Sequence, residues 1–154
     1  MTAREIEPAV DADALLAGAQ FMDAFCIDIG GRTLDARQAA ERMLGRRPRW
    51  IDMLLALRNM MVAPFGLKTS APAGATDLVG MFPVVSQTPE RLVAGFDDRH
   101  LDFRVIVDVA GSGHGQHVTA TTLVRTHNLF GRAYLAIIRP FHRLIVRRLL
   151  RQVA

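Results

Sequence analysis

Apolar positions near the end of the chain, in residues 129–153, recur with the period of an α-helix. Plotted at about 100° per residue, they fall in one stripe, and most of the nearby arginines fall on the opposite side. The stripe contains Tyr134, Leu135, Ile138, Phe141, His142, Ile145 and Leu149, and the opposite side contains Arg132, Arg139, Arg143, Arg147 and Arg151. Pro140 is expected to kink this helix without ending it. A helix about 37 Å long can cross a small domain, so the preceding chain must supply a surface for the stripe.

Side chains alternate between two sides along residues 20–29, which predicts a strand closed by two glycines. A helical period follows, with Asp35 and Gln38 spaced as a capping box and Gly45 at its end. A second, largely apolar helix is predicted to begin at Pro48, which is a favoured first residue of a helix.

Beyond residue 66 the period changes to two, which predicts antiparallel strands. The predicted strands are residues 67–69, 79–86, 91–97, 100–110 and 116–126. The last two are expected to form a hairpin that pairs Ala110 with Gln116. This order of elements predicts an α+β fold, in which a curved antiparallel sheet is gripped by the long C-terminal helix and two short helices follow the first strand. Residues 1–19 are expected to be an N-terminal extension, and residues 20–154 a single domain.

Composition restricts the class of protein. A chain of 154 residues, of which 50% are hydrophobic, is expected to form one globular domain and not to be disordered. We expect no transmembrane segment, because no apolar run is long enough to span a bilayer, and the first residues do not resemble a secretory signal. The one cysteine, Cys26, cannot form an internal disulfide, which favours a cytoplasmic location.

The net charge of +4 is unevenly distributed. Residues 129–154 contain six arginines and no acidic residue, whereas the first 128 residues carry 13 basic and 15 acidic side chains. This is not the distribution of a nucleic-acid-binding protein, and only Tyr134 accompanies the arginines as an aromatic that could stack on a base. The arginines can form a solvated helix face, or they can attract an anionic membrane surface or an acidic partner.

Two places in the chain carry residues suited to chemistry. His100, Asp102 and Arg104 lie on one side of a predicted strand, about 7 Å apart, where an acid–base pair and a guanidinium could share a ligand. The same residues also suit a solvated sheet face with cross-strand ion pairs. His142 lies on the apolar stripe, either as a hydrogen-bonded core residue or as a ligand contact. The histidines near the hairpin loop lack companions for a metal site, and no cofactor motif is visible, so neither a metal nor a cofactor is expected.

Five blocks of the sequence together resemble one bacterial family. They are PRW at 48–50 with LLALRN at 54–59, GLKT at 66–69, DDRHLDFR at 97–104, VRTHN at 124–128 and PFHRLIV at 140–146. In this order they resemble the family named domain of unknown function 2867, from about Phe21 to the C-terminus. The resemblance implies a helix-grip fold similar to the START-like superfamily of ligand-binding proteins and polyketide cyclases, with a cavity between sheet and helix. It also implies that blocks 97–104 and 125–128 lie at or near that cavity or its rim.

These observations lead to two functional hypotheses. The first is binding of a small hydrophobic or amphipathic molecule between the sheet and the C-terminal helix. The predicted ligand-binding residues are Arg104, Arg125, His127, Phe103, Tyr134, Ile138, Phe141 and His142. The second is a cofactor-free cyclase or dehydratase that uses a His–Asp pair, with His100 and Asp102 as candidates, and an arginine that holds the enolate.

One point of the site is left open by the sequence. Strand alternation puts Phe103 and Arg104 on opposite faces of the sheet, so both can line one cavity only if a bulge intervenes. Which face lines the cavity, and whether the protein is a homodimer, are likewise undecided.

Overall fold

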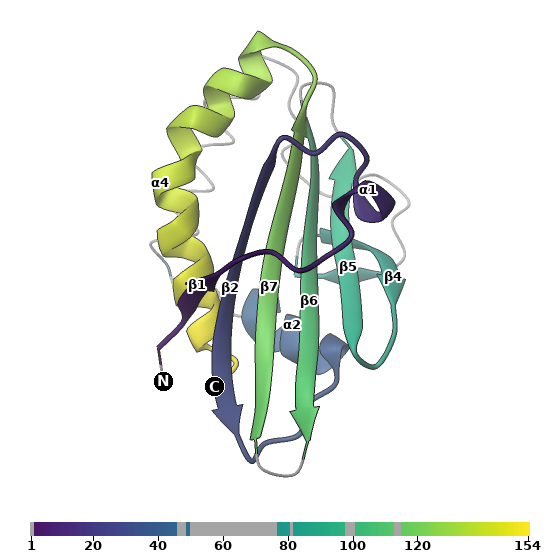
Figure 1. The fold of residues 1–154 in the computed structure, drawn as a ribbon, viewed down its shortest axis with the longest axis vertical. Helices are drawn as coiled ribbons and strands as arrows, with labels where there is room; N and C mark the ends of the chain where they lie inside the picture. The colour runs from purple at the N-terminus through teal and green to yellow at the C-terminus, as the bar shows by residue number, and fades with distance from the viewer. Residues whose placement is uncertain (1, 46–48, 50–76, 81, 98–100, 113–114) are drawn as a thin grey trace.

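The protein is built on a curved, open antiparallel sheet with a long helix along one edge (Figure 1). The structure, a computed structural model, describes residues 2–45, 49, 77–80, 82–97, 101–112 and 115–154. Within these residues the strands follow the order β1-β2-β7-β6-β5-β4-β3. The elements are β1 (Arg4–Ile6), α1 (Ala12–Leu15), β2 (Phe21–Gly30), α2 (Ala36–Gly45), β3 (Leu78–Val79), β4 (Phe82–Gln87), β5 (Arg91–Asp97), β6 (Leu101–Ser112), β7 (Gly115–Thr126) and α4 (Leu129–Arg151). The predicted α+β architecture with a gripping C-terminal helix is confirmed.

The capping signal predicted for α2 is present. The backbone N–H of Gln38 donates to Asp35 Oδ1 at 2.8 Å, and the backbone N–H of Asp35 donates to Gln38 Oε1 at 3.1 Å. These reciprocal bonds satisfy donors that the first helical turn leaves unpaired, which fixes where α2 begins. The helix predicted from Pro48 and the strand predicted at residues 67–69 lie outside the described residues, apart from Arg49.

The sequence predicts one strand at residues 79–86, whereas the structure divides these residues between two strands. β3 ends at Val79 and β4 begins at Phe82, and Gly80 between them has φ of +60°. A Cβ atom at this position would also lie 2.9 Å from the backbone oxygen of Leu44. Only glycine fits such a position without strain, and the alternation of apolar residues carries no sign of it.

The long hairpin of β6 and β7 is confirmed, but its predicted register is wrong by one residue. Ala110 pairs with His117, because the ladder continues through Gly111 to the pair Ser112↔Gly115. Glycines give no side-chain signal for a strand, so the predicted loop was too long. The alternation within each strand is unchanged, and the pairing stays regular from Leu101 to Ser112.

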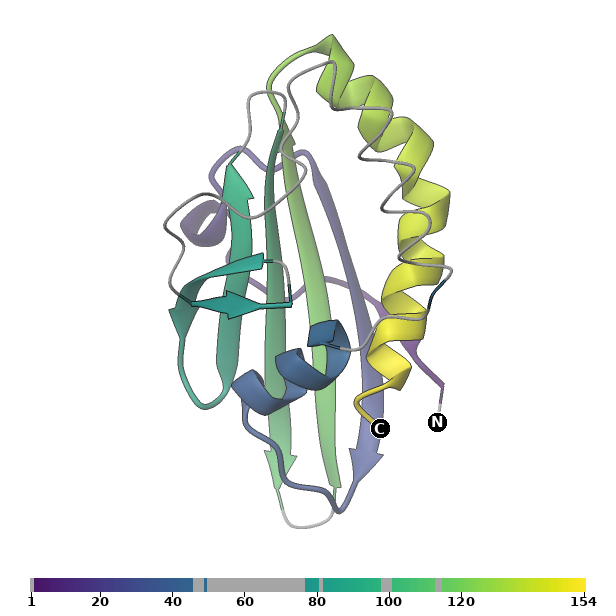
Figure 2. The same cartoon turned by 180° about the vertical axis from the view of Figure 1, so that it is seen from behind.

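One face of the sheet, here called the inner face, is covered by α2 and α4 (Figure 2). α2 crosses it at one end, and α4 runs along the β2 side. The main core forms where these layers meet, from Phe25, Ile27, Leu92, Val107 and Val118 of the sheet, Met43 and Leu44 of α2, and Val146, Leu149 and Leu150 of α4. Because burial of one such side chain is worth about 1.5–3 kcal/mol, this core supplies most of the driving force for docking both helices.

Arg37 ties α2 to the strands at the far edge of the sheet. Its guanidinium bonds to Glu41 at 2.7 Å and to Asp77 at 2.8 Å, and it also donates to the backbone oxygen of Leu78. The hydrogen bonds to Glu41 and Asp77 raise the pKa of Arg37 above its ordinary value, against the opposing effect of burial. These contacts thus fix the position of α2 relative to the strands at this edge.

The opposite, outer face of the sheet is covered in part by residues 2–19. β1 pairs with β2 from Arg4↔Cys26 to Ile6↔Ala24, and the chain then crosses the sheet to α1 (Figure 1). Leu16 packs there in a second, smaller cluster with Val93, Ile106 and Leu123. The residues expected to form an N-terminal extension therefore lie against the sheet and add a strand to it.

α4 begins where Asn128 accepts a hydrogen bond from the backbone N–H of Gly131 at 2.9 Å, as an N-cap does. It continues through Pro140 and bends along its length (Figure 1). The face that it buries overlaps the predicted stripe only in part, since Leu149 is buried and His142 and Ile145 are half-buried. Val146 and Leu150 are buried, whereas Phe141 is 49% exposed, so the helix is rotated about its axis relative to the prediction.

Three arginines of α4 contact the neighbouring strands. Arg143 forms an ion pair with Glu5 of β1. The guanidinium carbon of Arg139 lies 5.2 Å from the centre of the Phe21 ring, and that of Arg147 lies 5.4 Å from the centre of the Phe25 ring. These cation–π and ionic contacts help to hold α4 against β1 and β2, while Arg139 and Arg143 themselves stay exposed.

Candidate functional site

Strand alternation divides the predicted site residues between the two faces of the sheet. Phe103 packs on the inner-face core. Arg104 and Asp102 lie on the other side of β6, with Ile106 of the outer cluster. Because β6 pairs regularly with β7 through this stretch, no bulge brings Phe103 and Arg104 to one face. His100 lies outside the described residues.

A histidine and an aspartate meet on the inner face, between α4 and β2. His142 Nε2 lies 3.2 Å from each carboxylate oxygen of Asp23. The Asp23 side chain is 7% exposed and that of His142 is 19% exposed. Only the contact to Oδ1 has hydrogen-bond geometry, and no donor among the described residues satisfies the buried Oδ2. A buried carboxylate oxygen without a donor is costly, so this position calls for an explanation.

Aromatic side chains stand on both sides of this pair. The Phe21 ring meets the His142 ring edge to face, with centroids 5.9 Å apart, and Arg139 lies over the same Phe21 ring. On the far side of β7, the rings of Phe82, Phe96 and Phe103 form a cluster with centroids 5.2–6.2 Å apart. β2 and β6 are two strand spacings apart, about 10 Å. The inner face therefore has a polar pair at one side and an aromatic cluster about 10 Å away.

Burial changes along the inner face. Near α2, Ile27, Leu92 and Val107 are at most 1% exposed. Toward the N-terminal half of α4, Phe103 on the sheet and Tyr134 and Ile138 on the helix are only half-buried. The inner face is closely packed near α2, whereas the end that contains His142 is less completely filled by the described side chains.

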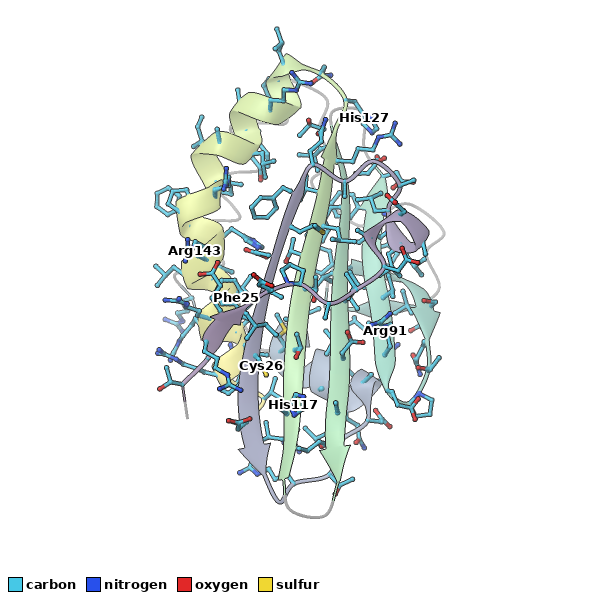
Figure 3. The ribbon with its side chains drawn as sticks, viewed as in Figure 1. Phe25, Cys26, Arg91, His117, His127 and Arg143 are labelled. Carbon is cyan, nitrogen blue, oxygen red and sulfur yellow. The ribbon has the colours of Figure 1, made fainter. Side chains whose placement is uncertain are left out.

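A second His–Asp pair lies on the outer side of the sheet. His127 Nε2 is 2.8 Å from Asp102 Oδ1, and their side chains are 32% and 13% exposed. Figure 3 labels His127 just beyond the end of β7. Beside it Arg104 bonds to Asp97 at 2.9 Å, and Arg125 donates to the backbone oxygen of Ala17 at 3.3 Å. This cluster links β5, β6, β7 and the segment before β2. Asp102 and Arg104 therefore form cross-strand ion pairs, which was one of the two roles that the sequence allowed for them.

Asp23 is the residue that the sequence reasoning missed. A signal for it was present, because it is the one acidic residue among Phe21, Phe25, Ile27 and Ile29 on the same side of a strand. An acid on an apolar side must be paired when the strand is buried. Phe141, in contrast, was predicted to contact a ligand but is half-exposed on the far side of α4.

Other site types find less support in the described residues. Within that part of the chain no group of three His, Cys, Asp or Glu side chains could hold a metal ion. No helix there is both long and apolar enough to cross a membrane. Two surface depressions are lined by Gln38, Glu41, Arg42 and Gln152, and by Gly30, Gly31, Arg32, Thr33, Gly111, Gly115 and Gln116. The described lining of both excludes His142 and His127.

Comparison with known proteins gives one result. The family described as Protein of unknown function (DUF2867) matches residues 15–149, which include α2, α4 up to Leu149 and every described strand except β1. No curated protein matches the chain.

Proposed function

The chain belongs to the family described as Protein of unknown function (DUF2867), and we propose that it binds a small, largely apolar molecule carrying one polar group. The ligand would lie between the inner face and the N-terminal half of α4, with its polar group at His142 and Asp23. The START-like likeness inferred from the sequence agrees with this location. The proposal is for a cytoplasmic protein, as the single cysteine favours.

The observation that carries the proposal is the buried Oδ2 of Asp23, which no donor among the described residues satisfies. A ligand hydroxyl or amine could donate to it, and would offset the cost of burying the carboxylate. Thr122, which pairs with Asp23 across the ladder, is 2% exposed and adds a second polar side chain from β7.

The positions of Arg104 and Arg125 restrict the chemical class of the proposed ligand. Arg104 and Arg125 lie on the outer side of the sheet, so they cannot bind a ligand carboxylate at His142. A hydrogen-bond donor therefore suits the inner pair better than the acidic group that the sequence also allowed. The apolar part would reach across β7 to Phe103, with Tyr134 and Ile138 of α4 above it.

Neighbouring positions on α4 offer a matched test. Ile138 is half-buried and Ile137 is 67% exposed. Ile138→Trp is expected to fill the space proposed for the ligand, whereas Ile137→Trp places the same bulk on the outside. Protein purified gently is weighed by native mass spectrometry before and after denaturation. A co-purifying molecule should be present in the parent and in Ile137→Trp, and lost from Ile138→Trp.

A result with the ligand equally present in both variants would place it elsewhere. If the parent carries no molecule, the same three proteins are titrated with the fluorescent apolar probe 1-anilinonaphthalene. Equal probe binding by all three, or none by the parent, would count against the proposal.

The contact between the His142 imidazole and the Asp23 carboxylate favours a second function, that of a cofactor-free cyclase or dehydratase. Asp23 would orient the imidazole, and the ring would take a proton from the bound molecule and return it. Arg139, which lies over the Phe21 ring beside His142, is better placed to stabilise an enolate than Arg104 or Arg125.

The two functions are separated by turnover of the bound molecule. An enzyme predicts that His142→Gln keeps binding within a few-fold but lowers kcat by about 100-fold or more. A pure binding protein predicts that the co-purified molecule is recovered unchanged after incubation with the parent. Product formation that is equal in parent and His142→Gln would contradict the acid–base role.

A further inference from the structure

The solvent side of α4 carries an apolar ridge, defined here as Ile137, Phe141 and Leu144. These residues are 67%, 49% and 57% exposed. At about 100° per residue the three fall within an arc of about 60°, roughly opposite the face that meets the sheet. Single exposed apolar residues are ordinary on a protein surface, but three that share one helix face form a contiguous strip.

Arginines continue the same line of the helix. Arg148 lies within this arc one turn after Leu144, Arg151 lies about 20° beyond its edge one turn later, and both are exposed. Among the described residues neither has an ion-pair partner, whereas Arg143 is paired with Glu5. Figure 3 labels Arg143 on the flank of α4. Two cations therefore extend the ridge, and no anion among the described residues neutralises them.

We infer that α4 docks on the surface of an anionic lipid bilayer, with the ridge inserted among the acyl chains near the headgroups. Ile137, Phe141 and Leu144 would leave water, and Arg148 and Arg151 would reach the lipid phosphates with their long side chains. The helix would lie in the plane of the membrane, as an amphipathic surface helix does. No described helix can cross the bilayer, so this contact is peripheral.

Charge and shape favour a membrane over a protein partner. Residues 129–154 contain six arginines and no acidic residue, so two copies of α4 facing each other would repel and could form no ion pair between the helices. The ridge is convex, so it offers no groove in which a peptide of another protein could dock. A lipid surface is broad, deformable and negatively charged, which matches both the apolar strip and the cations beside it.

The experiment is flotation of the full-length protein with vesicles of phosphatidylcholine alone or of phosphatidylcholine mixed with phosphatidylglycerol. The protein is expected to float with the mixed vesicles and not with the neutral ones, and to be released by high salt. Replacing all three ridge residues with serine should weaken binding by at least about tenfold. Arg148→Gln should weaken it by about fivefold, since one basic residue is lost from the surface.

Two control variants test whether a loss of vesicle binding is specific to the ridge and its arginines. Arg32→Gln removes an exposed arginine at the far end of β2, and Val85→Ser removes an apolar side chain, 56% exposed, on the opposite sheet edge. Both should float like the parent. Because the ridge residues are exposed, the serine variant is expected to fold, and circular dichroism checks this.

Three outcomes would overturn the inference. They are absence of flotation with mixed vesicles, equal flotation with neutral vesicles, and equal loss in the control variants. A dimer in sedimentation equilibrium that the serine variant converts to a monomer, without vesicle binding, would instead assign the ridge to contact between copies. These results are independent of whether the inner face holds a ligand.

Discussion

The two faces of the sheet each carry a His–Asp pair, and the pairs differ in their surroundings. On the outer side Asp102 and His127 lie 2.8 Å apart, next to Arg104 and Arg125 and close to solvent. On the inner face Asp23 and His142 lie 3.2 Å apart, with the carboxylate buried under a helix. The shorter contact is the more exposed one, so distance alone does not identify a functional site.

The surroundings of each His–Asp pair therefore decide its role. Water and neighbouring charges screen the outer pair, so its ionic contact is worth little beyond joining strands. The inner pair is in a region of low polarity, where an unsatisfied oxygen is costly and a polar ligand group is correspondingly favoured.

The first prediction compares the cores beneath the two faces. Leu150→Ala, at a fully buried position of the inner face, should lower the free energy of unfolding by about 3–4 kcal/mol, because the packed layers cannot collapse around the cavity. Leu16→Ala, at the edge of the smaller outer cluster, should cost about 2 kcal/mol, because the overlying segment can settle. Urea denaturation followed by circular dichroism measures both values. Equal costs would show that the first nineteen residues are packed as tightly as α4.

The second prediction concerns the inner pair itself. Replacing it with apolar residues, Asp23→Val with His142→Leu, should leave stability unchanged or raise it by about 1–4 kcal/mol. The physical reason is that the double change removes a buried oxygen that has no donor among the described residues. Binding of the co-purifying molecule should be lost at the same time. A large loss of stability would show that the pair holds α4 to the sheet and is structural.

The third prediction concerns the outer pair. Asp102→Asn should lower the free energy of unfolding by less than about 1 kcal/mol, and the loss should shrink further in high salt. Ligand occupancy of the inner face should not change. If Asp102→Asn abolished binding while the protein stayed folded, the functional face would have to be reassigned to the outer side.

Much of the fold could be predicted from short-range patterns. The capping box at Asp35 and Gln38, the N-cap at Asn128 and the alternation along β6 and β7 all depend on residues close in sequence. The split between β3 and β4 was missed because it depends on the φ angle of Gly80 and its contact with Leu44. The candidate site was predicted only in part, since His142 was named and its partner was not.

By itself, the sequence determined the periods of its side chains, and so the elements, the fold class and the presence of a histidine on an apolar helix. The tertiary structure decided which helix face meets the sheet, where Val146, Leu149 and Leu150 pack in the core and Arg143 pairs with Glu5 at the edge. It also brought together Asp23 and His142, which are 119 residues apart in the chain. Periodicity is a local property, whereas the choice of partner depends on how distant elements pack, and no local pattern encodes that choice.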